Sequence, residues 1–179
     1  MTQAQTAAPA VDESLKALLD EPLIPLPESG RSAHQAGLLA EARSVEAAEG
    51  PDAYWAWVAK RLRWIKPWTR VREGGFGDAR WFVDGTLNIC DNCVDRHAED
   101  PRTAQRLALI WETETGQTRT MTYLELREAV VRCANGLKSL GIGAGDVVAL
   151  YLPNLPETLV AIHACHRIGA VYTVLFSGF

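Results

Sequence analysis

The stretch Val147-Val-Ala-Leu-Tyr-Leu152, followed by a helix-forming run from Pro156 to Ile168 and by Val171-Tyr-Thr-Val-Leu175, decides the fold class of this chain. The first run is continuously apolar, which is typical of a strand in a sheet covered on both faces. Gly169 is expected to end the helix, and the third run has the composition of the next strand. A strand–helix–strand crossover of this length joins parallel strands. The sequence therefore predicts an α/β fold in which these two strands run parallel.

The segment before this unit predicts a β-hairpin followed by a long helix. Residues 107–111 and 119–122 have the composition of strands, and Gly116 lies in the turn between them. Thr122-Tyr-Leu-Glu125 has the pattern of a capping box, in which each of the two side chains accepts a backbone N–H at the start of a helix. Gly141 is expected to end this helix. Its apolar face should be formed by Leu126, Val130, Cys133, Leu137 and Leu140.

Closer to the N-terminus the sequence predicts three helices and a short strand. Residues 80–83 form the strand, with Asp84-Gly85 as its turn, and Asn88 is a suitable N-cap for the helix that follows. Residues 51–66 repeat apolar side chains at helical spacing until Pro67, and residues 31–48 form another helix. The apolar face of the helix after Asn88 should consist of Ile89, Cys90, Cys93, Val94 and His97.

Residues 1–30 differ in composition from the rest of the chain, because they are rich in Ala, Pro and Glu. Pro22, Pro25 and Pro27 lie too close together for one helix or one central strand. A short helix is compatible with residues 11–20. We expect this extension to be poorly ordered unless a partner holds it.

Length and composition exclude several classes of protein. The chain has 179 residues, of which 47% are hydrophobic, and this is enough for one ordinary domain. No apolar stretch approaches the about 20 residues of a membrane span, and the N-terminus lacks the basic start and apolar run of a secretory signal. Four cysteines in a chain of this length do not form a disulfide scaffold. We therefore expect reduced thiols, a cytoplasmic location and no membrane partner.

Charge is distributed unevenly along the chain. Residues 1–50 carry three basic and eight acidic side chains, whereas residues 54–80 carry seven basic and two acidic ones. This asymmetry suggests that the two segments meet each other or a third surface. The formal net charge of the whole chain is −4, which argues against nucleic acid as the main partner.

The basic segment is also rich in aromatic side chains, since five of the six tryptophans lie between residues 55 and 81. Tryptophans at helical spacing usually pack into a core, with Lys and Arg on the solvent side. Alternating aromatic and basic side chains could instead stack on nucleic-acid bases or dock a partner. The spacing favours core packing.

Two close pairs of possible metal ligands occur. Cys90-Asp-Asn-Cys93 has the spacing of half a zinc site or of a redox pair, and His163-Ala-Cys-His166 places two imidazoles three residues apart. Neither pair has further ligands at a suitable spacing, and free cysteines on an apolar helix face are commonly buried. Packing is the favoured interpretation of both pairs. The glycines from Gly141 to Gly145 follow a helix and precede a strand, which is the reverse of the order in a dinucleotide-binding loop. Taken together, these motifs predict neither a metal site nor a complete catalytic site.

Seven stretches follow one another in an order that is specific, although each stretch alone is weak. They are Tyr54-Trp55 through Trp64-Ile-Lys-Pro-Trp68, Trp81-Phe-Val-Asp-Gly-Thr-Leu-Asn88, Asn92-Cys-Val-Asp-Arg-His97, Ala108-Leu-Ile-Trp-Glu112, Thr122-Tyr-Leu-Glu-Leu126, Gly145-Asp-Val-Val-Ala-Leu-Tyr-Leu-Pro-Asn-Leu-Pro-Glu157, and Arg167-Ile-Gly-Ala-Val171 to Phe176-Ser-Gly-Phe179. Over residues 50–179 this series resembles the N-terminal part of the AMP-forming acetyl-CoA/propionyl-CoA synthetases, in the adenylate-forming acyl-CoA synthetase superfamily.

The resemblance implies a two-step ligase reaction. ATP activates a short carboxylic acid as an acyl-adenylate with release of pyrophosphate, and the thiol of coenzyme A then displaces AMP. Developing phosphate charge is met by Mg²⁺ and by fixed donors. The implied cofactors are ATP, coenzyme A and Mg²⁺, the implied substrate is acetate or propionate, and the implied partner is the remainder of the synthetase chain. In this family the ATP site, the Mg²⁺ site and the catalytic residues lie beyond Phe179, so this segment is expected to contain no catalytic residue.

One stretch carries a family site by resemblance. Phe176-Ser-Gly-Phe179 is similar to the family's Phe-Gly-Gly-Phe at the coenzyme A channel, so Phe176, Ser177 and Gly178 are the expected coenzyme A-binding residues. Gly178 matches a glycine that lets the backbone approach the pantetheine arm, whereas Ser177 departs from the usual glycine. The alternative is a tight strand end without a ligand.

The resemblance also implies a domain organisation. Residues 1–30 form the N-terminal extension, residues 31–87 a helical, tryptophan-rich segment of acetyl-CoA synthetase type, and residues 88–179 the start of a truncated AMP-binding domain. The expected fold is an N-terminal helical segment followed by part of a mixed or parallel sheet layer, incomplete as given. Two alternatives are the N-terminal part of a fused multi-enzyme propionyl-CoA synthase and a non-catalytic docking module.

Overall fold

The computed structural model describes residues 33–176. The short helix expected over residues 11–20 and the poor order expected of residues 1–30 lie outside the described residues. The chain divides into two compact units, residues 1–44 and residues 45–179. Helix α2 (Ala33–Glu49) crosses that boundary and confirms the predicted helix from Ala33 onward.

Helix α3 (Pro51–Ala59) is shorter than the helix predicted over residues 51–66. The Trp64 indole N–H donates to the Ala59 carbonyl at 2.9 Å, and the Arg63 backbone N–H donates to Asn92 Oδ1 at 2.8 Å. These bonds replace the one that a continuing helix would form between Arg63 and Ala59, so the helix ends there. Leu62 and Ile65, which were expected on its apolar face, are 41% and 73% exposed.

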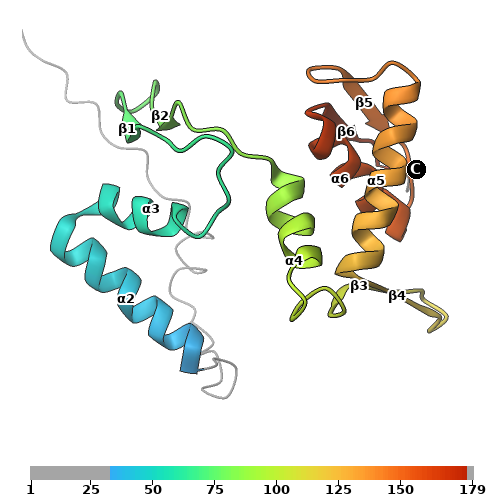
Figure 1. The fold of residues 1–179 in the computed structure, drawn as a ribbon, viewed down its shortest axis with the longest axis horizontal. Coiled ribbons are helices and arrows are strands. Elements are labelled where there is room, and N and C mark those ends of the chain that lie inside the picture. Colours follow the sequence, from blue (N-terminus) through green and yellow to red (C-terminus); the bar gives the residue numbers. More distant parts are fainter. Residues whose placement is uncertain (1–32, 177–179) are drawn as a thin grey trace, which may run out of the picture. The chain divides into compact units, whose positions relative to one another are not determined.

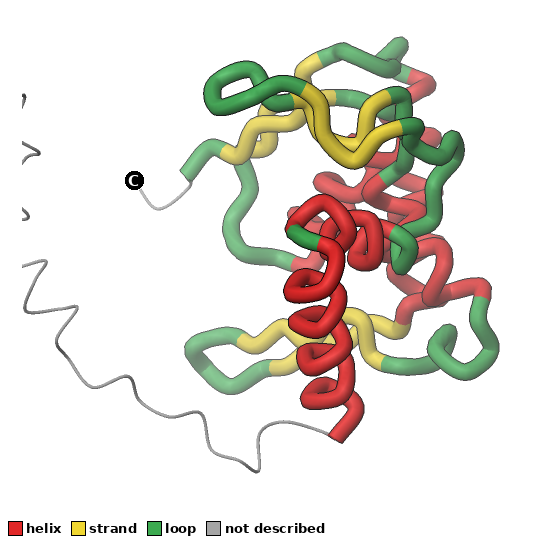
Figure 2. Tube along the Cα trace, turned by 90° about the vertical axis from the view of Figure 1, so that its left-hand side faces the viewer, coloured by secondary structure: helices red, strands yellow, loops and turns green. Residues whose placement is uncertain are grey.

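The described strands form three separate pairs (Figure 2). Strands β1 (Arg70–Glu73) and β2 (Arg80–Val83) are antiparallel, as are β3 (Leu107–Glu112) and β4 (Thr118–Thr122). Strands β5 (Val147–Leu150) and β6 (Val171–Val174) are parallel, with Val147 opposite Val171 and Leu150 opposite Val174. The predicted parallel pair is therefore confirmed.

Helices α5 (Tyr123–Ser139) and α6 (Pro156–Ile168) pack against each other beside this parallel pair (Figure 1). The capping box of α5 is confirmed, since the Thr122 N–H donates to Glu125 Oε2 at 2.7 Å and the Glu125 N–H donates to Thr122 Oγ1 at 3.2 Å. Gly141 and Gly169 follow the two helices with φ of 86° and 75°, the left-handed conformation that ends a helix at little cost for glycine. Both predicted helix ends are confirmed.

The helix after Asn88 contains an irregular turn. Asn88 Oδ1 accepts the N–H groups of Cys90 and Asp91, which confirms the predicted N-cap. The chain then forms a π-helical turn, η2 (Asp91–Asp95), before the short helix α4 (Arg96–Glu99). A π turn changes the angular spacing of side chains along a helix. The predicted apolar face is therefore partly wrong: Cys90 and Val94 are buried, but Ile89 and Cys93 are exposed.

The core lies between this helix and α5. Its buried members are Cys90, Val94, Leu126 and Val130, and Ala108, Met121 and Val160 pack against them. On α5 the buried face consists of Leu126, Val130 and Ala134, whereas Leu140, expected on that face, is the C-cap and is 78% exposed.

The parallel pair is covered on one face only in the described part of the chain. Helix α6 contacts both strands. Val147, Ala149, Val171 and Thr173 share the other face by register and are exposed. The expectation of a sheet covered on both faces is therefore not met here. None of the described helices has the length and apolar character needed to cross a membrane.

Candidate functional site

Strands β5 and β6 end at a common edge because they are parallel. In open α/β sheets, ligands bind at the carboxyl ends of the strands. The Leu175 N–H donates to the Leu150 carbonyl at 2.9 Å, so the pairing continues one residue beyond β6. Phe176 follows directly and is 71% exposed. Of the three residues expected to bind coenzyme A, the structure thus places Phe176 at this edge, while Ser177 and Gly178 lie outside the described residues.

The loop that follows β5 at the same edge is held by neighbouring elements. The Trp111 indole N–H donates to the Asn154 carbonyl at 2.6 Å, and Thr158 Oγ1 donates to the Pro153 carbonyl at 2.7 Å. A cavity of about 290 Å³ lies between β3 and the start of α6. Its lining includes no charged side chain, so it suits an apolar group better than a phosphate. The lining residues are Leu109, Trp111, Asn154, Leu155, Pro156, Thr158, Leu159 and Ile162.

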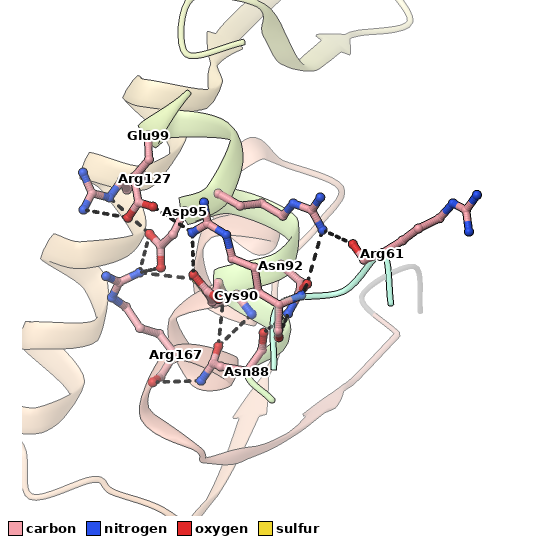
Figure 3. A network of polar contacts seen from close by, with 11 residues as sticks. Arg61, Asn88, Cys90, Asn92, Asp95, Glu99, Arg127 and Arg167 are labelled. Atoms are coloured by element: carbon pink, nitrogen blue, oxygen red, sulfur yellow. Dashed lines mark hydrogen bonds and ion pairs between the residues drawn. The ribbon is translucent and has the colours of Figure 1, made fainter. Parts of the chain in front are cut away.

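A network of ion pairs and hydrogen bonds lies beside the last turn of α6 (Figure 3). Asp95, from the π turn, is buried and lies between Arg127 of α5 and Arg167 of α6. The Arg167 Nη1 donates to both carboxylate oxygens at 2.7 and 2.8 Å, and Arg127 Nε donates at 3.2 Å. A buried carboxylate requires such partners, because it has lost its hydration.

The same network extends to the segment that follows α3. The Asn92 amide exchanges two hydrogen bonds with the Arg63 backbone, at 2.8 and 2.9 Å. The Arg96 guanidinium donates to the Arg61 carbonyl at 2.8 Å, and Arg63 pairs with Glu99 at 2.7 Å. The tryptophan-rich segment is thereby attached to the π turn and α4 through several polar bonds.

The structure places the two thiols of the cysteine pair differently. Cys90 is buried and Cys93 is exposed, so the two thiols lie in different surroundings. Burial raises the pKa of the Cys90 thiol, against the opposite effect of its hydrogen bond from Arg167. A thiol with a raised pKa is a poor nucleophile and a poor metal ligand. Across residues 33–176, no group of three or more His, Cys, Asp and Glu side chains is placed to hold a metal ion.

The two histidines of α6 pack as rings. Their centroids are 5.6 Å apart, and His166 also contacts the ring of Tyr172 in β6. Both Nδ1 atoms are buried and have no hydrogen-bond partner in the part of the chain that the structure describes. Burial lowers the pKa of both histidines, which favours their neutral forms. This arrangement agrees with packing rather than with chelation.

Four tryptophans of the basic segment fall into two groups. Trp64 and Trp68 are half-buried and contact each other and Phe82. Trp55 and Trp81 are 40% and 45% exposed and, with Phe82, line a cavity of about 220 Å³. The core-packing interpretation therefore holds for the first group and fails for the second.

The Asp95 cluster was not predicted from the sequence, although Asp95 and Arg167 both lie in stretches that resemble the family. The two residues are 72 positions apart, and a single sequence does not reveal such a pairing. An isolated Asp beside an Arg in a predicted helix is typical of a solvated face. Asp95 lies in the π turn, which has no sequence signature here.

Comparisons with known proteins cover most of the chain. Residues 41–93 match the acetyl-coenzyme A synthetase N-terminus, and residues 94–179 match the AMP-binding enzymes. Acetyl-coenzyme A synthetase of Gemmatimonas aurantiaca is 49% identical over 133 residues, which are 74% of this chain and 20% of that protein. The Vibrio cholerae acetyl-coenzyme A synthetase is 46% identical over 134 residues, which are 72% of this chain and 20% of that protein. The chain thus spans about a fifth of the length of these relatives.

A solved structure has the same fold over this region. It is the acetoacetyl-CoA synthetase from Streptomyces lividans, which is 29% identical and aligns with a TM-score of 0.69 over 78% of this chain and 24% of that chain. The two family matches adjoin each other without a gap from residue 41 to residue 179. By sequence and by fold, this chain belongs to the AMP-binding enzymes and corresponds to the N-terminal part of an acyl-CoA synthetase of that family.

Proposed function

We propose that this chain is the N-terminal part of an AMP-forming synthetase that joins acetate to coenzyme A. Two observations carry the proposal: residues 41–93 match the acetyl-coenzyme A synthetase N-terminus, and acetyl-coenzyme A synthetases are 45–49% identical to this chain over 133–139 residues. In the proposed reaction the acid's carboxylate attacks the α-phosphorus of ATP and pyrophosphate leaves. The thiol of coenzyme A then attacks the acyl carbon, AMP leaves, and the thiol proton is released.

The proposed role of this segment is to form one wall of the coenzyme A channel. Phe176 continues directly from the paired end of β6, at the edge where α/β sheets bind ligands. Ser177 and Gly178 would extend that wall, with a glycine where the backbone must approach the pantetheine arm. The ATP and Mg²⁺ sites are proposed to lie in the part of the relatives that this chain, which spans about a fifth of their length, does not cover.

The proposal also names the carboxylic acid that the enzyme activates. The matched relatives are named for acetyl-CoA and the solved structure for acetoacetyl-CoA, so acetate, propionate and acetoacetate are the acids to compare. The full-length protein should catalyse acid-dependent ATP–pyrophosphate exchange and CoA-dependent formation of AMP. We expect the highest kcat/KM with acetate and a lower value with propionate. Absence of both reactions with all three acids would contradict the proposal.

A second candidate, a docking module, has one observation in its favour. Trp55 and Trp81 line an open apolar cavity within a segment of seven basic and two acidic side chains. A non-catalytic docking role predicts that Trp81→Ala abolishes binding of the partner, and that no acyl-CoA is formed with or without this substitution. It also predicts that the 179-residue chain unfolds as a monomer in one cooperative transition.

A further inference from the structure

Asp95 is the only buried charged residue among those whose burial the structure describes. Its side chain is 12% exposed, and two guanidinium groups from two different helices meet it. Removing one partner of such a cluster leaves an uncompensated charge in a site with little water. The neighbouring elements must then move to restore hydration, so the cluster restrains the positions of α5 and α6.

The last turn of α6 is held at its backbone as well as through Arg167. The Asn88 amide Nδ2 donates to the His166 carbonyl at 2.9 Å and to the Arg167 carbonyl at 3.4 Å. Asn88 also caps the helix that contains Asp95. The final carbonyls of α6 and the Arg167 side chain are therefore attached to the same short helix (Figure 3).

The chain from this turn to Phe176 is bonded along most of its length. The Gly169 carbonyl accepts the Gly145 N–H at 3.0 Å, and the Val171 N–H donates to the Asp146 carbonyl at 2.8 Å. Strand β6 then pairs with β5 in full register, and its pairing continues to Leu175. Hydrogen bonds therefore link the last turn of α6 to the start of β6 and continue along that strand to Leu175, the residue before Phe176.

We infer that Asp95 and Arg167 are positioning residues for the proposed coenzyme A channel, acting through α6 and β6 on Phe176. This inference rests on the proposed function and deepens it. The pair touches neither substrate nor cofactor in the proposal. The pair restrains the start of strand β6, whereas the proposed wall of the channel lies at the carboxyl end of the same strand.

The test separates the two half-reactions of the full-length protein. Acid-dependent ATP–pyrophosphate exchange needs no coenzyme A, whereas acyl-CoA formation does. Asp95→Asn keeps the shape of the side chain and removes its charge. We expect this variant to raise the KM for coenzyme A about tenfold while exchange stays within about twofold of the wild type. Arg167→Lys retains the charge but not the planar guanidinium, and it should raise the same KM by a smaller factor.

Asp100→Asn is the matched control. Asp100 also pairs with an arginine, Arg102 at 2.8 Å, but this pair lies in the turn after α4, where Asp100 bonds to Arg102, Thr103 and Ala104. The control should leave the KM for coenzyme A unchanged.

A KM for coenzyme A within twofold of the wild type in both folded variants would overturn the inference. Equal losses in the two half-reactions, or failure of both variants to fold, would do the same, because they assign the pair to stability alone. A wild-type protein without exchange activity would instead contradict the proposed function, before any variant is made.

Discussion

At the scale of single residues, the four cysteines differ widely in their surroundings. Cys93 is exposed, Cys133 is partly buried, and Cys90 and Cys165 are fully buried. Burial raises the pKa of the last three thiols. A thiol reacts as its thiolate and only where a reagent can reach it, so burial and a raised pKa both slow the reaction.

We therefore predict that Cys93 of the 179-residue chain reacts first with a maleimide. Cys90 and Cys165 should react at least about tenfold more slowly, because labelling requires local opening of the core. Mass spectrometry of the digested protein after timed labelling measures each cysteine separately. Cys93→Ser should abolish the fast phase. Equal rates for Cys90 and Cys93 would show that the π turn does not separate the two thiols.

At the scale of the element, α5 has sequence signals for its start and its end, and it contains one residue of low helix propensity. The capping box satisfies backbone groups at its start, and Gly141 takes the left-handed conformation after its end. Gly136 lies within the helix, and a methyl group added there would meet no atom within 4 Å. These two glycines therefore differ in what replacement by alanine would do.

We predict opposite effects of the same substitution at these two positions. Gly136→Ala should stabilise α5 by about 0.5–1 kcal/mol, because alanine loses less backbone entropy in a helix than glycine. Gly141→Ala should destabilise it by about 1 kcal/mol, because an L-residue is strained at a φ of 86°.

Hydrogen exchange of the α5 amides in the full-length protein measures both changes. Exchange should slow in the first variant and accelerate in the second. A stabilising Gly141→Ala would contradict the left-handed helix end.

At the scale of the whole molecule, the parallel pair presents uncovered apolar surface in the described residues. Val147 is 68% exposed, Val171 54% and Leu175 46%. Strands β5 and β6 pair with each other and with no other described strand, so each has an unpaired edge. Exposed apolar strands with free edges favour association between chains.

We predict that the 179-residue chain by itself associates in solution and forms no acyl-CoA. The apolar face and the strand edges are the reason for association, and the proposed position of the ATP site after Phe179 is the reason for inactivity. Light scattering during size-exclusion chromatography measures the first property, and an assay with acetate, ATP and coenzyme A measures the second. A soluble monomer with one cooperative melt would favour the docking role, and pyrophosphate release would place the ATP site within these residues.

Elements with local signals could be predicted from the sequence, which also indicated the family. The capping box at Thr122 and the glycines after α5 and α6 act through neighbours in the chain, so a pattern of a few residues suffices. The apolar runs of β5 and β6 indicated strands, and the crossover between them indicated their parallel pairing.

The remaining features depend on tertiary contacts. Helix α3 ends at Ala59 because Trp64 and the distant Asn92 take up its backbone groups. Asp95, in the π turn, is buried between arginines from two other helices, one of them 72 residues away. Such contacts form between elements that are far apart in the sequence. No short stretch of the chain contains both partners, so a local pattern does not predict these contacts.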